Sequence, residues 1–226
     1  LDIDAALSLA FDFETPVTAI LKHNNACGVA TGGTPLANWK DALAADPVSA
    51  FGGILITNTL INKEVAEEIN KIFFEVIIAP DYDTDALEVL MQKKNRIILI
   101  RKESKTSSMQ FRSLLNGVLV QDKDLSIQTA ADLEPITDKQ PSASEVDDLL
   151  FANKLVKNSK SNAITLVKNK QLCASGIGQT SRVDSLRQAI EKAASFGVDL
   201  KGAVMASDAF FPFPACVEIA GEAGLT

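Results

Sequence analysis

The chain has 226 residues, a formal net charge of −7 and an isoelectric point near 4.8, so it is long enough to bury a substantial core. Its acidic balance argues against general nucleic-acid binding, because such binding needs Lys and Arg to neutralise phosphates. No segment approaches the roughly 18 to 20 uninterrupted apolar residues of a membrane span, and no basic stretch precedes an apolar one at the start. We therefore expect neither a nucleic-acid nor a membrane partner.

The three cysteines are Cys27, Cys173 and Cys216, which are widely spaced and form no C-x-x-C pair. This spacing favours neither a disulfide framework nor a zinc site. We expect a cytoplasmic protein that requires no metal.

The first half of the chain alternates predicted strands and helices. Thr34 followed by Pro35 is typical of a capping residue and a first helical position. Apolar runs predict strands at 16–22, 51–57, 75–79 and 96–100. Helical spacing predicts a helix end over 5–11 and helices at 35–44, 62–72 and 84–93. This alternation is typical of an α/β protein whose sheet is flanked by helices.

A polar segment between Gln121 and Ser144 separates this half from the next, and we interpret it as a linker or as an edge hairpin followed by a connection. Ser144 then resembles the N-cap of a helix that runs to about Val156. Later patterns predict strands at 162–167 and 171–174, a helix near 181–194 and a strand at 202–206. We expect a first α/β unit at 1–125, a linker at 126–143 and a second α/β unit at 144–226.

The only histidine, His23, follows Lys22 where an apolar strand breaks into a polar turn. Ligands of α/β proteins bind at the carboxyl edge of the sheet, so we expect these side chains to face a ligand. Histidine suits proton transfer near neutral pH because its ordinary pKa is about 6.5. The competing interpretation is a surface or core histidine without a chemical role. Only the neighbouring motifs decide between the two.

Two loops of the second half also carry residues typical of binding sites. The loop 175–182 is rich in small residues and ends at Arg182, a pattern that lets an anion approach backbone N–H groups. An ordinary strand-to-helix connection has the same composition. The loop 207–213 holds three phenylalanines around a proline, which indicates either a core plug or an aromatic wall for a flat heterocycle. Neither loop alone indicates a reaction.

Taken together, these segments resemble the aminoimidazolecarboxamide ribonucleotide (AICAR) formyltransferase domain of the bifunctional purine biosynthesis proteins. The first matching stretch reads Leu-Lys-His-Asn-Asn-Ala-Cys-Gly-Val-Ala, and the last reads Ser-Asp-Ala-Phe-Phe-Pro-Phe. The matches follow the family's order and span almost the whole chain, at 21–30, 46–53, 75–80, 161–163, 176–185 and 207–213. This joint pattern is far more specific than any single loop.

The resemblance implies two similar three-layer α/β/α units resembling the cytidine deaminase fold, the second of them incomplete. It implies transfer of a formyl group from 10-formyltetrahydrofolate, as co-substrate, to the 5-amino group of AICAR during synthesis of inosine monophosphate (IMP). His23 matches the family's base that removes the amine proton. Lys22 matches its partner, whose ammonium stabilises the developing oxyanion or assists departure of the folate nitrogen.

Five further positions match the family's nucleotide contacts. Gly52 lies where a side chain would intrude on the nucleotide, and Glu75 where a carboxylate meets the ribose hydroxyls. Asn162 and Arg182 match residues that engage the base and carboxamide, to which an amide and a planar guanidinium are suited. Phe210 matches an aromatic contact that stacks on the nucleotide.

The folate side of the resemblance is weaker. Ser49 matches a folate contact less closely than the nucleotide residues match theirs. After Phe213 the family has a basic or proline residue and then an acid, whereas this chain has Pro214 and Ala215. Ala26 stands where the family commonly has proline. We therefore expect the acid that meets the folate pterin to be missing.

The resemblance also implies a fragment. The matching region starts after the family's Arg-Tyr-Gly-x-Asn-Pro-His-Gln segment and stops before its Arg- and His-rich end, so we expect an incomplete phosphate pocket and no cyclohydrolase domain. One hypothesis is a formyl-transferring domain of a homodimer. The other is a catalytically silent fragment that at most binds the nucleotide weakly. A zinc deaminase is a distant third, because the composition lacks the Cys and His ligands.

Overall fold

The computed structural model describes residues 1–102 and 107–226. The strands are β1 (Val17–Lys22), β2 (Asn25–Thr31), β3 (Gly53–Thr57), β4 (Phe74–Ala79), β5 (Ile97–Ile100), β6 (Met109–Leu114), β7 (Gly117–Asp122), β8 (Ile164–Lys168), β9 (Gln171–Gly176) and β10 (Val204–Ser207). The helices are α1 (Asp2–Phe11), α2 (Pro35–Ala45), α3 (Lys63–Ile69), α4 (Thr84–Leu90), α5 (Ala143–Lys157), α6 (Arg182–Ser195) and α7 (Ala215–Glu222), with a 3₁₀ turn η1 (Ala130–Asp132).

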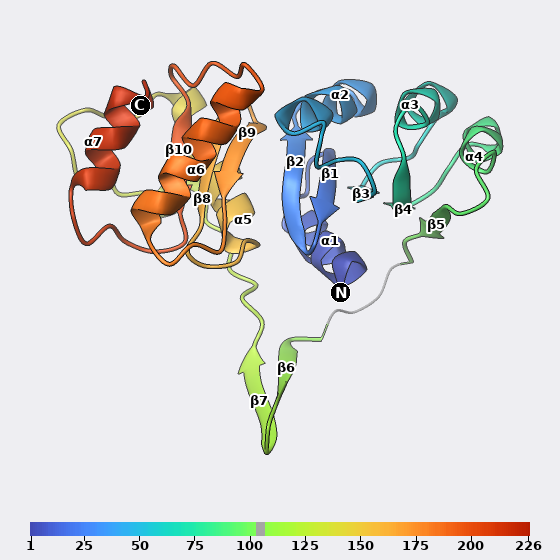
Figure 1. Cartoon of the computed structure of the whole chain (residues 1–226), viewed down its shortest axis with the longest axis horizontal. Helices are drawn as coiled ribbons and strands as arrows, with labels where there is room; N and C mark the ends of the chain where they lie inside the picture. Colours follow the sequence, from blue (N-terminus) through green and yellow to red (C-terminus); the bar gives the residue numbers. More distant parts are fainter. Residues whose placement is uncertain (103–106) are drawn as a thin grey trace.

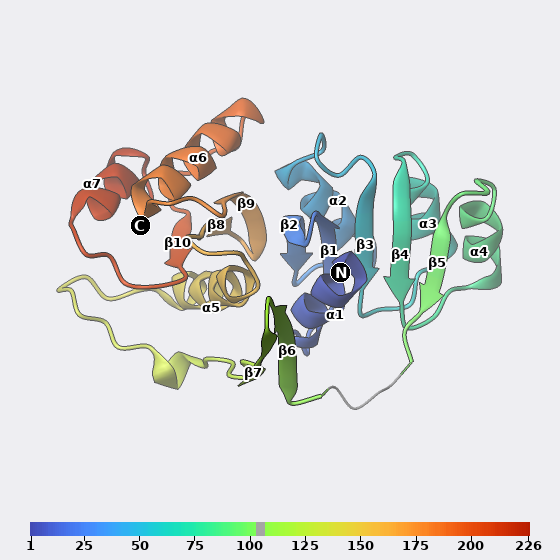
Figure 2. The ribbon, with the colours of Figure 1, turned by 60° about the horizontal axis from the view of Figure 1, so that its bottom comes forward.

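Eight strands form one sheet in the order β10-β8-β9-β2-β1-β3-β4-β5 (Figure 2). The strands β3, β4 and β5 run parallel, and the other neighbours are antiparallel. The two halves of the sheet meet where β2 pairs with β9 through Ala30 and Gln171. This observation confirms the predicted α/β class.

The two halves repeat the same order of elements. Each begins with a helix and a hairpin, whose tight turns lie at His23–Asn24 (φ 52° and 64°) and at Asn169–Lys170 (φ 55° and 59°). Two successive positive φ angles are typical of the type I′ turn, whose twist matches that of a hairpin. A helix and a strand then follow each hairpin. The repeat supports the proposed division into two units, whose boundaries at 125 and 143 stay predictions.

The same close packing recurs in both halves, where the second hairpin strand meets the following helix. A Cβ on Gly28 would lie 1.9 Å from the carbonyl oxygen of Ala42, and a Cβ on Gly176 would lie 1.8 Å from that of Ser185. Any side chain at either position would push the helix away from the sheet. Glycine therefore fixes how closely α2 and α6 approach their strands.

Helices cover both faces of the sheet (Figures 1 and 2). On one face, Leu9 of α1 and Leu155 of α5 belong to a single apolar cluster that crosses both halves. The rings of Phe13 and Phe151 are 5.6 Å apart within it. On the opposite face, α2, α3 and α4 cover one half and α6 and α7 the other. This shared cluster joins the two halves through apolar burial.

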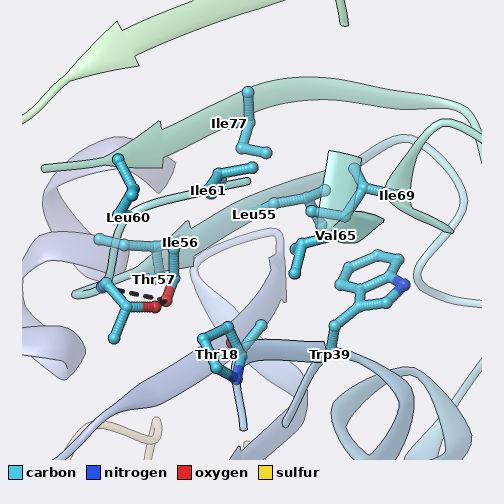
Figure 3. Close-up of a pocket in the computed structure, with 12 residues that line it drawn as sticks. Thr18, Trp39, Leu55, Ile56, Thr57, Leu60, Ile61, Val65, Ile69 and Ile77 are labelled. Atoms are coloured by element: carbon cyan, nitrogen blue, oxygen red, sulfur yellow. Dashed lines mark hydrogen bonds between the residues drawn. The ribbon is translucent and has the colours of Figure 1, made fainter. Parts of the chain in front are cut away.

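Most of the side chains that line the crevice between α2, α3 and the sheet are apolar (Figure 3). The ring of Trp39 lies beside Val65 and Ile69 of α3 (Figure 3), and the remaining void is about 10 Å³. Leu55 and Ile77 line the same crevice from the sheet. That volume is about the minimum for one water molecule, and its lining is almost wholly apolar. This crevice is therefore packed core.

A separate hairpin of β6 and β7 projects from the rest of the protein (Figure 1). All twelve of its strand residues are exposed, among them Phe111, Leu114 and Val118. The sequence interpretation allowed an edge hairpin between 121 and 144, but the hairpin lies earlier and, within residues 1–102 and 107–226, pairs with no strand of the main sheet. An isolated two-stranded sheet is at best marginally stable in water, and this hairpin has no buried strand residue to add to its stability.

Most predicted elements are confirmed within a few residues, with some corrections. Ser142, not Ser144, caps α5, because its hydroxyl and the Glu145 carboxylate form a reciprocal capping box. The strands β2, β6 and β7, the helix α7 and the 3₁₀ turn η1 were not predicted. Among the described residues, none of the helices is both long and apolar enough to cross a membrane.

Candidate active site

Lys22 and His23 lie at the turn between β1 and β2. Lys22 ends β1 and is half-buried, and its ammonium donates a 2.6 Å hydrogen bond to the carbonyl oxygen of Phe51. His23 is exposed and adopts a left-handed conformation with φ 52°. Because β1 runs antiparallel to β3, this edge of the sheet holds the amino ends of β3 and β4. The sequence analysis expected these side chains at the carboxyl edge of the sheet. This expectation is right for β1, whose carboxyl end lies here, but wrong for β3 and β4, whose amino ends lie here.

A cavity of about 260 Å³ opens beside this turn and is lined from both halves of the protein. The first half contributes both candidate catalytic residues and Ser49, and the second half contributes residues of β9 and α6. The full lining consists of Lys22, His23, Asn25, Ala26, Cys27, Ser49, Ser175, Ile177, Gln188 and Lys192. The volume approaches the size of small-molecule sites.

The turn 46–53 contributes Ser49 to the lining of this cavity and is organised by Asp46, which is only 2% exposed. Its carboxylate accepts a 2.8 Å hydrogen bond from the backbone N–H of Ser49 and forms an ion pair with Lys192 of α6. Burial opposes ionisation, but the contacts with Lys192 and Ser49 outweigh it and lower the pKa of Asp46. The carboxylate is therefore held in its charged form.

The Cys27 thiol lies in the same cavity and is held protonated. Burial and the negative charge of Asp46 raise its pKa to about 12, although Lys192 acts in the opposite direction. Its sulfur lies 3.4 Å from the carbonyl oxygen of Ile20. A neutral thiol is a poor nucleophile, so Cys27 is not a candidate for covalent catalysis.

Gly52 and Glu75 lie at the same edge of the sheet. Gly52 has a φ of 73°, a conformation that favours glycine, and its N–H donates a 2.8 Å hydrogen bond to Phe73. Glu75 is exposed and falls where the pairing of β3 and β4 shifts register, next to Gly53. Neither residue lines the cavity beside Lys22.

A second group of predicted residues lies at the amino end of α6. The side-chain amide of Asn162 donates to the carbonyl oxygen of Gln179 at 3.0 Å. Arg182 lies 3.5 Å from the carboxylate of Asp208, which also accepts from the hydroxyl of Ser161. Burial acts against ionisation of Asp208, but its backbone contact, the Ser161 hydroxyl and the Arg182 charge lower its pKa overall. This group forms a polar network beside the start of β8.

Phe210 is 80% exposed in the loop after β10. Phe213 is also exposed, whereas Phe211 packs against the apolar cluster beneath α6 and α7. Of the two alternatives for this loop, Phe211 fits the core plug. Phe210 and Phe213 offer open aromatic faces.

Strand register brings the two groups of predicted residues to one edge of the sheet. β9 runs antiparallel to both β2 and β8, so its carboxyl end lies beside the amino ends of those strands. The Lys22–His23 turn and the Asn162–Arg182 group therefore share an edge. Ser49 joins the first group in the cavity, but Asn162, Arg182 and Phe210 do not line it.

Comparison with known proteins decides the family. The model of the AICARFT/IMPCHase bienzyme family matches residues 1–192. The chain belongs to the AICARFT/IMPCHase bienzyme family. The resemblance inferred from the sequence is thereby confirmed.

Curated relatives of this family match along the whole chain. A bifunctional purine biosynthesis protein PurH from Bacteroides thetaiotaomicron is 72% identical over 226 residues, which are all of this chain and 45% of the relative. Proteins of the same name from Aquifex aeolicus and Persephonella marina are 46% and 43% identical, again over all of this chain and 44% of each relative. The chain thus spans a little under half the length of these AICARFT/IMPCHase relatives.

The sequence analysis did not identify Asp46 and Lys192 as residues of the candidate site. Asp46 entered only as the first residue of the matching stretch 46–53, and Lys192 lies within an ordinary helical pattern. The one available signal was the Asp-Pro-Val-Ser stretch, whose aspartate precedes the Ser49 candidate. Within residues 1–102 and 107–226, no group of three or more His, Cys, Asp or Glu side chains is arranged to hold a metal ion.

Proposed function

We propose that this chain supplies the formyl-transfer site of a bifunctional purine-biosynthesis enzyme, with AICAR as acceptor and 10-formyltetrahydrofolate as donor. One observation carries the proposal. Lys22 and His23 both line a cavity of about 260 Å³ in a chain of the AICARFT/IMPCHase family. The name of its relatives, bifunctional purine biosynthesis protein, supports the same pathway.

In this proposal His23 acts as the base. The 5-amino group of AICAR is a weak nucleophile because its lone pair is delocalised into the ring and carboxamide. His23 takes the amine proton as the nitrogen attacks the formyl carbon, and the bond from that carbon to the folate nitrogen then breaks. The folate nitrogen takes up the proton that His23 removed and leaves as a neutral amine, so His23 returns to its neutral form and the charges balance. The exposed position of His23 beside the cavity is compatible with this role.

Lys22 stabilises the charge that develops on the formyl oxygen. The ammonium carries three N–H donors, and the carbonyl oxygen of Phe51 accepts from one of them at 2.6 Å. The other donors remain for the oxyanion or for the departing folate nitrogen. A fixed cation costs little reorganisation at the moment of reaction, which is the condition for electrostatic stabilisation.

The group at the amino end of α6 binds the nucleotide in this proposal. The Arg182 side chain is 20% exposed, and its guanidinium carries donors beyond the one that faces Asp208, so a donor is available for the carboxamide or base. Asn162 adds an amide, and the exposed ring of Phe210 offers a stacking surface. Gly52 and Glu75 are assigned to the space beside the nucleotide and its ribose, and Ser49 to the folate.

We further propose a cytoplasmic homodimer. The three cysteines are free, as expected in a reducing compartment. The hairpin of β6 and β7 exposes apolar side chains on both strands. Contiguous exposed apolar surface commonly marks an interface, so we assign this hairpin to the contact with a second copy.

Calorimetric titration with AICAR tests the proposal, with a Lys22→Ala, His23→Ala double variant and a formyl-transfer assay on the same samples. Binding with turnover that disappears in the double variant is the expected result. Binding without turnover would instead favour a catalytically silent fragment. Absence of binding at millimolar AICAR would contradict a nucleotide site in this chain.

A further inference from the structure

Lys192 connects the second half of the protein to the first at the proposed active site. It lies on α6, and its ammonium forms an ion pair with Asp46, whose side chain is 1% exposed. The Lys192 side chain is 34% exposed and lines the cavity that holds Lys22 and His23. The contact is therefore both a bridge between the halves and part of the cavity wall.

Asp46 in turn organises the turn 46–53. One carboxylate oxygen accepts from the N–H of Ser49 at 2.8 Å, and the backbone oxygen of Asp46 accepts from the N–H of Ala50 at 3.1 Å. The oxygen of Ala50 accepts from Gly53 at 3.0 Å. These bonds leave the backbone of the turn with little freedom between Asp46 and the start of β3.

The same turn presents its carbonyl to the proposed catalytic lysine. The Phe51 oxygen lies in the middle of the turn and accepts the 2.6 Å hydrogen bond from Lys22. A continuous series of polar contacts therefore runs from Lys192 through Asp46 and the turn to Lys22. The Asp46 end of this series is buried, where polar contacts are stronger, whereas the contact of Lys22 with Phe51 is exposed.

We propose that Lys192 is a positioning residue that sets the ammonium of Lys22 through Asp46 and the turn 46–53. The inference rests on the proposed function of Lys22. Removing Lys192 leaves a buried carboxylate without its cation, and the carboxylate must then rotate toward water or be protonated. Rotation releases the N–H of Ser49, and protonation weakens its hydrogen bond, so either change loosens the turn that holds the Phe51 carbonyl. The second half of the protein thus controls a catalytic group of the first.

A matched control separates positioning from mere attachment of the two halves. Lys157 of α5 forms another partly buried ion pair between the halves, 3.1 Å from Asp12 near α1, on the opposite face of the sheet. Lys157→Met removes that pair without touching the turn. Lys192→Met removes the pair under study, and Lys192→Arg restores a cation at the same place.

Two readouts do not need activity. One is hydrogen exchange at the amides of Ser49 and Ala50, and the other is the rate of reductive methylation of Lys22. We expect both to rise about tenfold or more in Lys192→Met, to stay unchanged in Lys157→Met and to recover in Lys192→Arg. Equal effects of Lys192→Met and Lys157→Met, or no effect of Lys192→Met, would overturn the inference.

Formyl-transfer kinetics add the functional readout. In Lys192→Met we expect kcat to fall by about 10- to 100-fold, with the Kd for AICAR changed less than about threefold, because a displaced catalytic group costs rate more than binding. An unchanged kcat in Lys192→Met would contradict the inference. If the unmodified chain shows no transfer, the proposed function fails, and the exchange and methylation results still decide whether Lys192 positions Lys22.

Discussion

The ammonium of Lys22 is tied to the carbonyl oxygen of Phe51 by a 2.6 Å hydrogen bond that joins the end of β1 to the turn before β3. A lysine at a strand end ordinarily loses much conformational entropy on being fixed. Here the turn fixes the head group in advance, next to the only histidine of the chain. The proposed role of both side chains depends on this arrangement and on the packing that supports it.

Lys22→Met should lower kcat for formyl transfer by about 100-fold, because an electrostatic donor to the developing oxyanion is lost. The Kd for AICAR should change little, since the lysine acts on the formyl group. Steady-state kinetics and calorimetry on the same sample measure the two effects. Lys40→Met, on the exposed face of α2, is the control and should leave both values unchanged.

Arg182→Met should weaken AICAR binding by about tenfold, which corresponds to one charge-assisted hydrogen bond. Calorimetric titration measures the change. Arg187→Met provides a matched control, because Arg187 lies on the same helix with an exposed side chain. Equal losses in the two variants would argue against a specific role for Arg182.

Gly28→Ala should destabilise the protein by about 1 to 3 kcal/mol or more, because the new methyl group overlaps the carbonyl of Ala42 and overpacks the helix–sheet contact. Chemical denaturation measures the free energy of unfolding. Gly117→Ala in the β6–β7 hairpin should be nearly neutral, because a methyl group at that position would meet no other described part of the chain within 4 Å. A stable Gly28→Ala variant would mean that α2 lies farther from β2 than described.

The Asp46 ion pair should make stability depend on acid pH. The pKa of Asp46 is lower in the folded protein than the ordinary value of about 3.9, so its contribution is complete above that pH and is lost as the pH falls through the folded value. Asp46→Asn should remove this part of the acid-induced loss of stability. We would measure the free energy of unfolding by chemical denaturation at pH values from about 2 to 7, which span the titration of aspartate. Between the acid and neutral ends of this range, the free energy of unfolding should change less for the variant than for the unmodified protein.

Much of the fold could be predicted from the sequence because its signals are local. The alternation of apolar strands and amphipathic helices depends on residues a few positions apart, and Thr34 with Pro35 marks the start of α2 as expected. The strand β2 was missed because Asn25, Cys27 and Gly28 have no strand-like pattern. Its pairing with β1 follows from the tight turn at His23 and not from its own composition.

The candidate site was only partly predictable for a related reason. Lys22 and His23 carry a recognisable motif, but the contact of Lys192 with Asp46 joins residues far apart in the chain. An ion pair between two halves leaves no periodic signal in either segment. Strand register, which places Arg182 and Lys22 at one edge, likewise emerges only when β2 meets β9.

One measurement tests the central claim most directly. It compares the rate of formyl transfer from 10-formyltetrahydrofolate to AICAR between the His23→Ala variant and the unmodified chain. The account predicts measurable turnover in the unmodified chain and a loss of about 100-fold or more in the variant, as expected when a general base is removed. AICAR binding should persist in both. Equal turnover in the two proteins would contradict the assignment of His23 as the base.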